Sequence, residues 1–182
     1  AEGVGAAILK GYELMHGDGV EVIAVMAGDA QMDPRDLGPL LAPICSSEAE
    51  YVKGDRFSHP HLWRSMPKDR LFGNTVLTWV TRGVSGYREL KDAQCGYTAI
   101  DARLVPELLL APVERGYGFP NSLLAFLGGV GARLSQVCVR PIYGEESSGL
   151  KMGLVLRRYP RVLWNSWRMR LSIQGEHRSF ED

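Results

Sequence analysis

The sequence predicts an α/β protein in which a mostly parallel sheet is flanked by helices. Strand-like apolar segments alternate along the chain with segments of helical pattern, which is typical of such sheets. The apolar run at 22–27 is rich in β-branched residues and indicates a strand buried on both faces. With 182 residues, the chain is long enough for one domain with a substantial core.

Each element follows from the local pattern. The chain opens in helix-like sequence and then reaches the apolar run. Pro34 suits the first position of a helix, because proline has no N–H to lose there. Apolar residues at Leu71, Val76, Leu77 and Val80 give the longest internal helix its packing surface. The predicted helices cover about 4–16, 35–44, 68–83, 103–110, 121–128 and 153–172, and the predicted strands 21–26, 51–52, 95–101 and 134–140.

Composition excludes several classes of protein. The 21 basic and 21 acidic residues cancel, so we expect no nucleic-acid partner. Cys45, Cys95 and Cys138 are far apart and lack Cys-x-x-Cys spacing, which favours buried thiols in a reducing compartment over disulfides or a zinc site. No strand is followed by a Gly-x-Gly-x-x-Gly helix start, so a dinucleotide-binding oxidoreductase is disfavoured. No secretory signal or membrane-spanning apolar run is visible.

Three polar side chains follow the first strand at alternating positions: Asp29, Gln31 and Asp33. Ligands of α/β proteins bind at the open ends of parallel strands. Hard oxygen atoms placed there suit Mg²⁺ or Mn²⁺ that also holds substrate phosphates. The alternative is a turn whose polar side chains are simply solvated.

This segment resembles the metal-binding Asp-x-Asp region of family 2 glycosyltransferases, especially the dolichol-phosphate mannosyltransferase-like branch that loads a sugar onto a polyprenyl phosphate. The resemblance implies a GT-A (Rossmann-like) fold and assigns Asp29 and Gln31 to a Mg²⁺ or Mn²⁺ ion. Ala27 stands where the family usually has a carboxylate, so fewer protein ligands are expected.

A second match covers residues 92–97, where the family shows Asp-x-Gln/Thr-Cys/Ser-Gly-Phe/Tyr. The resemblance places Gln94, Gly96 and Tyr97 on the sugar and acceptor side of the site. Gly96 would let backbone approach the substrate closely. Asp92 is the candidate general base, although it could instead cap a turn while Cys95 fills core.

Three residues are implied near an acceptor phosphate. Arg56 follows the second strand, where the family often shows Gly-Ser-Arg or Gly-Asn-Arg, and its planar fork suits two phosphate oxygens. Arg70 and Asn74 are four residues apart on a helix and therefore face the same way. Together the three residues would form a cationic cradle for the phosphate. The alternatives are that Arg56 is an ordinary surface arginine and that Asn74 lies on a solvated helix face.

Two further segments resemble the family. Many relatives carry a carboxylate where this chain has Asn121 or Ser122. A phosphate acceptor is already anionic and needs no base, so this difference favours lipid phosphate, and Asp92→Asn should then be tolerated. Residues 140–151 resemble the loop that closes over nucleotide phosphates, with Ser148 and Lys151 as contacts.

The resemblance covers only the later part of a family catalytic domain. A first strand, a Pro-x-Tyr-Asn-Glu-like loop that holds the nucleotide base and a second strand normally come before the position of Ala1. We therefore expect residues 1–150 to be an N-terminally truncated catalytic domain that is inactive alone. Gly3 and Gly5 open the first helix, and close helix packing is favoured for them over phosphate binding.

Residues 151–182 are predicted to form a basic amphipathic helix and tail. Six positive charges and no acid occur between 151 and 173, interleaved with apolar residues that include Trp164 and Trp167. Such a helix suits an anionic membrane surface, and Pro160 would kink or split it. We expect a cytoplasmic protein, peripheral on the cytoplasmic membrane face. The alternative is a basic helix packed on the domain by its apolar side.

The favoured function is metal-assisted, inverting transfer of a sugar from a nucleotide-sugar donor to a polyprenyl (dolichyl-type) phosphate. Two alternatives remain. A family 2 enzyme could act on a sugar hydroxyl in polysaccharide synthesis, with Asp92 as its essential base. A non-catalytic, membrane-associated scaffold would account for Ala27.

Overall fold

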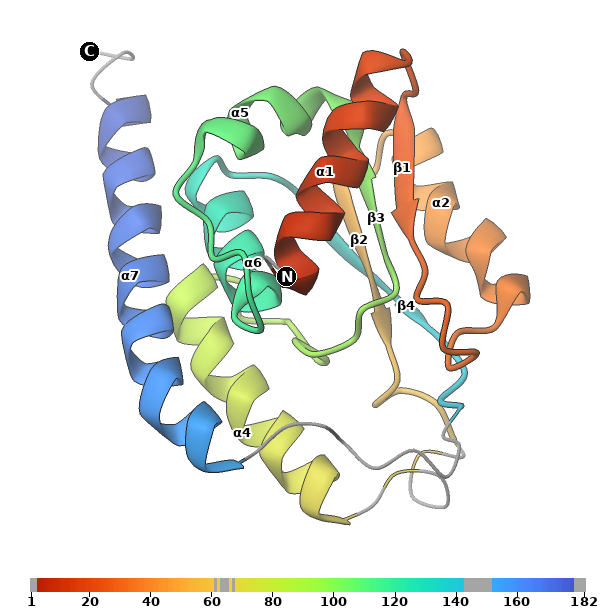
Figure 1. Ribbon diagram of the computed structural model, residues 1–182. Helices are drawn as coiled ribbons and strands as arrows, with labels where there is room; N and C mark the ends of the chain where they lie inside the picture. Colours follow the sequence, from red (N-terminus) through yellow and green to blue (C-terminus); the bar gives the residue numbers. More distant parts are fainter. Residues whose placement is uncertain (1–2, 61, 63–65, 67, 143–151, 179–182) are drawn as a thin grey trace.

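The computed structural model describes residues 3–60, 62, 66, 68–142 and 152–178 (Figure 1). A four-stranded sheet is covered by helices on both faces. The elements in chain order are α1 (Val4–Gly17), β1 (Val22–Val25), η1 (Pro34–Asp36), α2 (Leu37–Cys45), β2 (Tyr51–Asp55), α4 (Lys68–Ser85), β3 (Thr98–Asp101), η2 (Ala102–Leu104), α5 (Val105–Leu110), α6 (Phe119–Gly129), β4 (Leu134–Cys138) and α7 (Met152–Arg178).

The sheet is mixed, with the strand order β1-β3-β2-β4. β2 and β4 pair in parallel, whereas β3 lies antiparallel between β1 and β2. Three of the four strands therefore run in one direction, but only one of the three pairings is parallel. The reason is the irregular segment 86–97, which returns the chain to the edge where β2 ended, so that β3 starts there and runs the opposite way.

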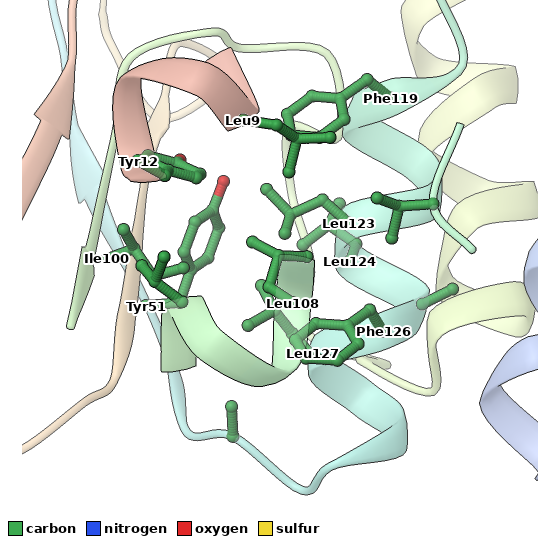
Figure 2. Packing of buried hydrophobic residues seen from close by; sticks show 14 of the residues in the cluster. Leu9, Tyr12, Tyr51, Ile100, Leu108, Phe119, Leu123, Leu124, Phe126 and Leu127 are labelled. Carbon is green, nitrogen blue, oxygen red and sulfur yellow. The ribbon is translucent and has the colours of Figure 1, made fainter. Parts of the chain in front are cut away.

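Alternating side chains of each strand enter two separate cores. Tyr51 of β2 and Ile100 of β3 point toward α1, α5 and α6, where they meet a large apolar cluster (Figure 2). Their neighbours Val52 and Ala99 face α2 and pack against Leu40. This period of two is the expected consequence of strand geometry, and it makes the domain a helix–sheet–helix sandwich.

Helix α6 is the central helix of the larger core. Most of its side chains are buried, and α4 and α7 pack against it and against each other. Gly128 permits the close approach of α4, because a Cβ there would overlap the carbonyl oxygen of Ser85. At the start of α1, a Cβ on Gly5 would lie 2.7 Å from the Cβ of Phe119, which confirms the packing role expected for this glycine.

Most predicted elements are present within a few residues of their expected bounds. β2 is longer than expected and reaches Asp55, and β3 starts only at Thr98. Helix α7 continues through Pro160, so of the two expected effects of this proline the split does not occur. In the part of the chain that the structure describes, no helix has the length and apolar character to cross a bilayer.

Candidate functional site

The candidate site lies at one edge of the sheet. β1, β2 and β4 end at this edge, and β3 begins there because it runs the opposite way. The segments that follow β1, β2 and β4, and the segment that precedes β3, are therefore brought together. A small pocket at this edge is lined by Gln31, Met32, Arg56, Cys95, Gly96, Tyr97, Val139, Arg140 and Ile142.

Arg56 and Asp92 form a two-pronged ion pair beside this pocket. Arg56 Nε donates to Asp92 Oδ2 at 2.6 Å, and Arg56 Nη2 donates to Asp92 Oδ1 at 3.0 Å. The side chain of Asp92 is fully buried, whereas that of Arg56 is 19% exposed. The pair therefore fixes the orientation of a guanidinium whose outer part still reaches the pocket.

Further contacts of Asp92 make it a structural carboxylate. Its Oδ1 also accepts hydrogen bonds from the backbone N–H groups of Gln94 and Cys95, at 3.1 and 3.0 Å. Burial by itself would raise the pKa of Asp92, but the charge and hydrogen bonds of Arg56, aided by Lys53, outweigh it and lower that pKa. A buried, ion-paired carboxylate of low pKa is a poor general base. The geometry thus favours positioning over proton abstraction, and it leads us to expect a loss of stability in Asp92→Asn.

Lys53 is a buried cation below the pocket that the sequence analysis did not single out. It lies on β2 with 1% exposure, and its Nζ donates to the carbonyl oxygen of Cys95 at 2.5 Å. Burial lowers the pKa of Lys53, and burial raises the pKa of the Cys95 thiol. Lys53 therefore ties the 92–97 segment to the central strand. In the sequence, the sign of this role was a lysine at an inward-facing position of a predicted strand.

The two expected metal ligands follow β1 in a tight turn. Asp29 Oδ1 accepts a hydrogen bond from the backbone N–H of Gln31 at 3.0 Å, and Ala30 between them has φ 59°. Gln31 lines the pocket, whereas Asp29 is exposed and is not among the lining residues. The carboxylate of Asp33 has a different role, because it accepts hydrogen bonds from Arg35, whose side chain and backbone N–H lower the pKa of Asp33 to about 2.

These oxygen atoms fit a divalent cation only if the substrate supplies further ligands. Among the residues that the structure describes, no three His, Cys, Asp or Glu side chains gather into a metal-binding group. Asp29 and Gln31 offer one carboxylate and one amide oxygen. Mg²⁺ commonly takes one or two protein ligands and fills its shell with phosphate oxygens and water. The donor set is therefore suited to a metal that arrives with a diphosphate.

The structure brings only part of the second motif to the pocket, because Gln94 does not line it. Gly96 and Tyr97 line the pocket, and the Tyr97 hydroxyl donates to the Asp33 carbonyl oxygen at 3.3 Å. Gln94 Nε2 donates to Asn121 Oδ1 at 3.5 Å, and Asn121 Nδ2 donates to Thr81 Oγ1 at 2.5 Å. Asn121, which is fully buried, thus connects the motif to α4 rather than facing the pocket.

The structure does not join Asn74 to the proposed phosphate cradle. Its side-chain amide lies 4.0 Å from the sulfur of Met66, and it does not line the pocket that contains Arg56. The backbone of Arg70 belongs to α4, but its side chain is not among the described ones. Ser148 and Lys151 fall outside the described residues altogether.

Met32 and Arg140, to which the sequence analysis gave no individual role, also line the pocket. Met32 follows Gln31, and its sulfur accepts a hydrogen bond from the Ala27 N–H at 3.1 Å. Arg140 follows β4, and its backbone N–H donates to Asp36 at 2.9 Å. Arg140 adds a second cation to the pocket of Arg56. In the sequence, the sign that Arg140 lies at this edge of the sheet was its position directly after a predicted strand.

Helix α7 uses its apolar side within the domain. Met169 is buried in the main core, and Leu163, Trp167 and Ile173 pack against that core. This arrangement agrees with the alternative of a basic helix packed on the domain. The opposite face still exposes Arg161, Arg168, Leu171 and Trp164, the last at 58%.

The cysteines differ from the expectation of three buried thiols. Cys95 is buried, but Cys45 and Cys138 are exposed, and all three are free. Cys45 ends α2 and Cys138 ends β4, where each element meets solvent.

Comparison with known proteins assigns the fold. Residues 1–109 match the family described as glycosyl transferase family 2. The chain is 26% identical over 146 residues to the UDP-N-acetylglucosamine–dolichyl-phosphate N-acetylglucosaminyltransferase of Methanococcus voltae. The aligned region covers 80% of this chain and 58% of that protein.

Solved structures of glucosyl-3-phosphoglycerate synthase from Mycobacterium tuberculosis share the fold. The complex with UDP has a TM-score of 0.66 at 17% identity, and it covers 91% of this chain and 55% of that one. The complex with Mn²⁺, UDP-glucose and phosphoglyceric acid has a TM-score of 0.59 at 16% identity, with the same coverage. The GT-A expectation is thereby confirmed, and the chain spans little more than half the length of these relatives.

Proposed function

Because the chain belongs to glycosyl transferase family 2, we propose that it is part of an enzyme that transfers a sugar from a nucleotide-sugar donor to a dolichyl-type prenyl phosphate. The name of the Methanococcus voltae relative supports the acceptor class, and UDP in the similar solved structures supports the donor class. The observation that carries the proposal is the buried ion pair between Arg56 and Asp92.

That ion pair argues for an acceptor that needs no base. A sugar hydroxyl must lose a proton as it attacks, so it requires a nearby carboxylate able to accept one. Asp92 is buried and fully engaged, and Asn121 replaces any carboxylate on α6. A phosphate monoester is already anionic near neutral pH. Arg56, held in place by Asp92, and Arg140 supply the positive charge that attracts it.

The proposed reaction is a single displacement with inversion. An acceptor phosphate oxygen attacks the anomeric carbon and forms the new carbon–oxygen bond. The bond from that carbon to the donor diphosphate breaks, and its electron pair leaves with the nucleotide diphosphate. Arg56 orients the attacking phosphate, and Gly96, which has no side chain, leaves space for the sugar.

Asp29 and Gln31 would hold a divalent cation together with the donor diphosphate. When bound, such a cation offsets the negative charge that builds on the leaving group. The Mn²⁺ complex of the similar synthase supports this proposal for the metal. The oxygen-only donor set accepts Mg²⁺ equally well.

The acceptor class is tested with the full-length protein, UDP-sugars and two acceptors that differ only in the phosphate: farnesyl phosphate and farnesol. We expect product from farnesyl phosphate and at least about 100-fold less from farnesol, because the alcohol lacks the anion that Arg56 binds. Arg56→Lys keeps the charge but loses the fork, and it should raise KM for farnesyl phosphate about tenfold with donor KM nearly unchanged.

Two results would contradict this proposal. Equal use of farnesol would favour hydroxyl acceptors, and absence of transfer from every nucleotide sugar would favour the non-catalytic scaffold. Activity with farnesyl phosphate that does not respond to Arg56→Lys would remove Arg56 from acceptor binding.

We also propose that the exposed face of α7 contacts an anionic membrane and that the protein is peripheral on the cytoplasmic membrane face. Arg161, Trp164, Arg168 and Leu171 share this face at helical spacing. Each cation near an anionic surface adds about 1 kcal/mol. Arg161→Ala with Arg168→Ala should therefore weaken binding to phosphatidylserine-containing vesicles by about 30-fold.

The control for this measurement has the same change in charge. Arg88→Ala with Arg115→Ala removes two exposed arginines that lie outside α7, and it should leave vesicle co-sedimentation near that of the wild-type protein. Equal effects of the two double variants would exclude a specific role for α7. Deleting α7 is not a suitable test, because Met169 belongs to the core.

A further inference from the structure

The loop that follows Asp92 leaves one backbone N–H without a partner in the protein. The N–H groups of Gln94 and Cys95 both donate to Asp92 Oδ1. None of the described residues accepts a hydrogen bond from the next N–H, that of Gly96. Gly96 is exposed and lines the pocket at the sheet edge. Because a backbone N–H is a strong donor, this one is available to a ligand in the pocket.

Strand β2 holds the loop on both sides of Gly96. Lys53 Nζ donates to the carbonyl oxygen of Cys95 at 2.5 Å, and the Gly54 N–H donates to the carbonyl oxygen of Tyr97 at 2.8 Å. The packing is close, since a Cβ on Gly54 would lie 2.9 Å from Cys95 Sγ. The two hydrogen bonds therefore fix the peptide groups that flank Gly96.

The planarity of the Cys95–Gly96 peptide decides where its N–H points. The peptide is trans, so the N–H is directed opposite to the C=O of the same peptide. That C=O points at Lys53, whose side chain is buried. The Gly96 N–H consequently faces away from the interior, on the side where Gly96 is exposed.

Lys53 also strengthens this donor. Burial lowers the pKa of Lys53, and the negative charge of Asp92 opposes that change. Within residues 3–60, 62, 66, 68–142 and 152–178, Lys53 makes no ion pair, because Asp92 is paired with Arg56. The ammonium charge therefore acts on the Cys95 carbonyl in a buried environment, where electrostatic interactions are strong. Polarising the carbonyl makes the N–H of the same peptide more positive, so the Gly96 N–H is suited to an anionic oxygen atom.

We propose that the Gly96 N–H donates a hydrogen bond to the phosphate of the acceptor, and that Lys53 is the positioning residue that orients and polarises this donor. Arg56 and Arg140 line the same pocket, so a phosphate that binds their guanidinium groups lies beside Gly96. A fixed backbone N–H stabilises an anion without reorganising. This inference rests on the function proposed above, and it adds a contact to the acceptor that is independent of the arginine side chains.

The test observes the proposed donor directly by NMR in the full-length protein. Cys95 is the only one of the three cysteines in these 182 residues that a glycine follows. Labelling with carbonyl-¹³C cysteine and ¹⁵N glycine therefore selects the Cys95–Gly96 peptide, and loss of its signal in Gly96→Ala checks the assignment. Farnesyl phosphate should shift the Gly96 amide proton downfield, because a hydrogen bond to an anion deshields it. Farnesol should leave the resonance in place.

Lys53→Met tests the positioning role. Methionine has a similar length but neither charge nor donor, so the downfield shift should be smaller. The Kd of farnesyl phosphate, measured by equilibrium dialysis without a sugar donor, should rise at least tenfold. Lys10→Met is the matched control, since it removes the same charge from an exposed lysine of α1. Its shift and its Kd should equal those of the wild-type protein.

A second pair of variants keeps the test decisive if Lys53→Met does not fold. Gly96→Pro removes the N–H, whereas Gly96→Ala adds a Cβ and keeps the N–H. The added Cβ would lie 3.3 Å from Met32 Cε, the end of a flexible side chain. The proline variant should therefore bind farnesyl phosphate at least tenfold more weakly than the alanine variant.

Three results would overturn the inference. The first is a Gly96 amide proton that does not move at saturating farnesyl phosphate, and the second is equal affinity of the proline and alanine variants. The third is an unchanged shift and Kd in Lys53→Met, or a loss equal to that in Lys10→Met, either of which would remove Lys53 from the proposal. Failure of the proposed function is distinguishable, because farnesyl phosphate would then shift the Gly96 proton without receiving sugar.

Discussion

Asp92→Asn should lower the free energy of unfolding by about 3 kcal/mol. Removing one member of a buried ion pair leaves its partner without compensation and typically costs about 3–5 kcal/mol. Asp92 is fully buried, and it also accepts hydrogen bonds from two backbone N–H groups of its own loop. The 19% exposure of Arg56 lets water moderate the loss, so we expect the lower part of that range. Urea denaturation at neutral pH measures it.

The matched control is Asp101→Asn. Asp101 pairs with Arg103 through a similar two-pronged contact, but the Arg103 side chain is 78% exposed. Exposed pairs contribute about 0–1 kcal/mol, so this substitution should cost at most about 1 kcal/mol, since asparagine keeps the helix cap that Asp101 provides. Equal losses in the two variants would contradict a special role for the Arg56–Asp92 pair.

The stabilisation that the Asp92 carboxylate provides depends on pH with a definite sign. Arg56 holds the pKa of Asp92 below its usual value, so the folded state binds the proton less tightly than the unfolded state does. The stabilisation is therefore present above the unfolded pKa of about 3.9 and is lost as pH falls through the folded pKa. The stability difference between wild type and Asp92→Asn should stay constant from about pH 5 to 8 and narrow only in stronger acid.

Asp29→Asn should reduce sugar transfer by the full-length protein at least about 100-fold. A catalytic cation contributes several kcal/mol of charge stabilisation, and each 1.36 kcal/mol is a factor of about ten in rate. Asp29 is the one carboxylate of the proposed donor pair, because Asp33 is engaged with Arg35. Initial rates at several Mn²⁺ and Mg²⁺ concentrations measure the effect, and the unfolding midpoint should be unchanged because Asp29 is exposed.

Asp18→Asn provides the control, because Asp18 is an exposed aspartate in the turn after α1. Its activity and metal dependence should match the wild-type protein. If Asp29→Asn retained normal metal-dependent activity, Asp29 would have no part in holding the cation, whereas a loss shared by both variants would point to a general effect of charge.

The helices and strands were predicted well because the apolar patterns that specify them involve residues close together in the sequence. Helices α1, α4 and α6 and strand β1 follow from apolar periodicity that any folded state must bury. The direction of β3 did not follow, since strand–helix alternation predicts parallel crossovers and says nothing about the return path of residues 86–97. The exposure of Phe72 and Trp79 on α4 did not follow either, because periodicity identifies an apolar face without showing whether a partner covers it.

The sequence by itself determined the family resemblance, the alternation of strands and helices and the polar groups at the strand ends, among them Asp29, Arg56 and Gly96. Only the tertiary structure decided what those groups do. From the sequence, Asp92 was the candidate general base, with a turn cap as the alternative, whereas in the structure Arg56 lowers its pKa. Lys53 gained a role only because β2 places it against the carbonyl oxygen of Cys95. Protonation and orientation depend on neighbours that are distant along the chain, and folding alone brings those neighbours within hydrogen-bonding distance.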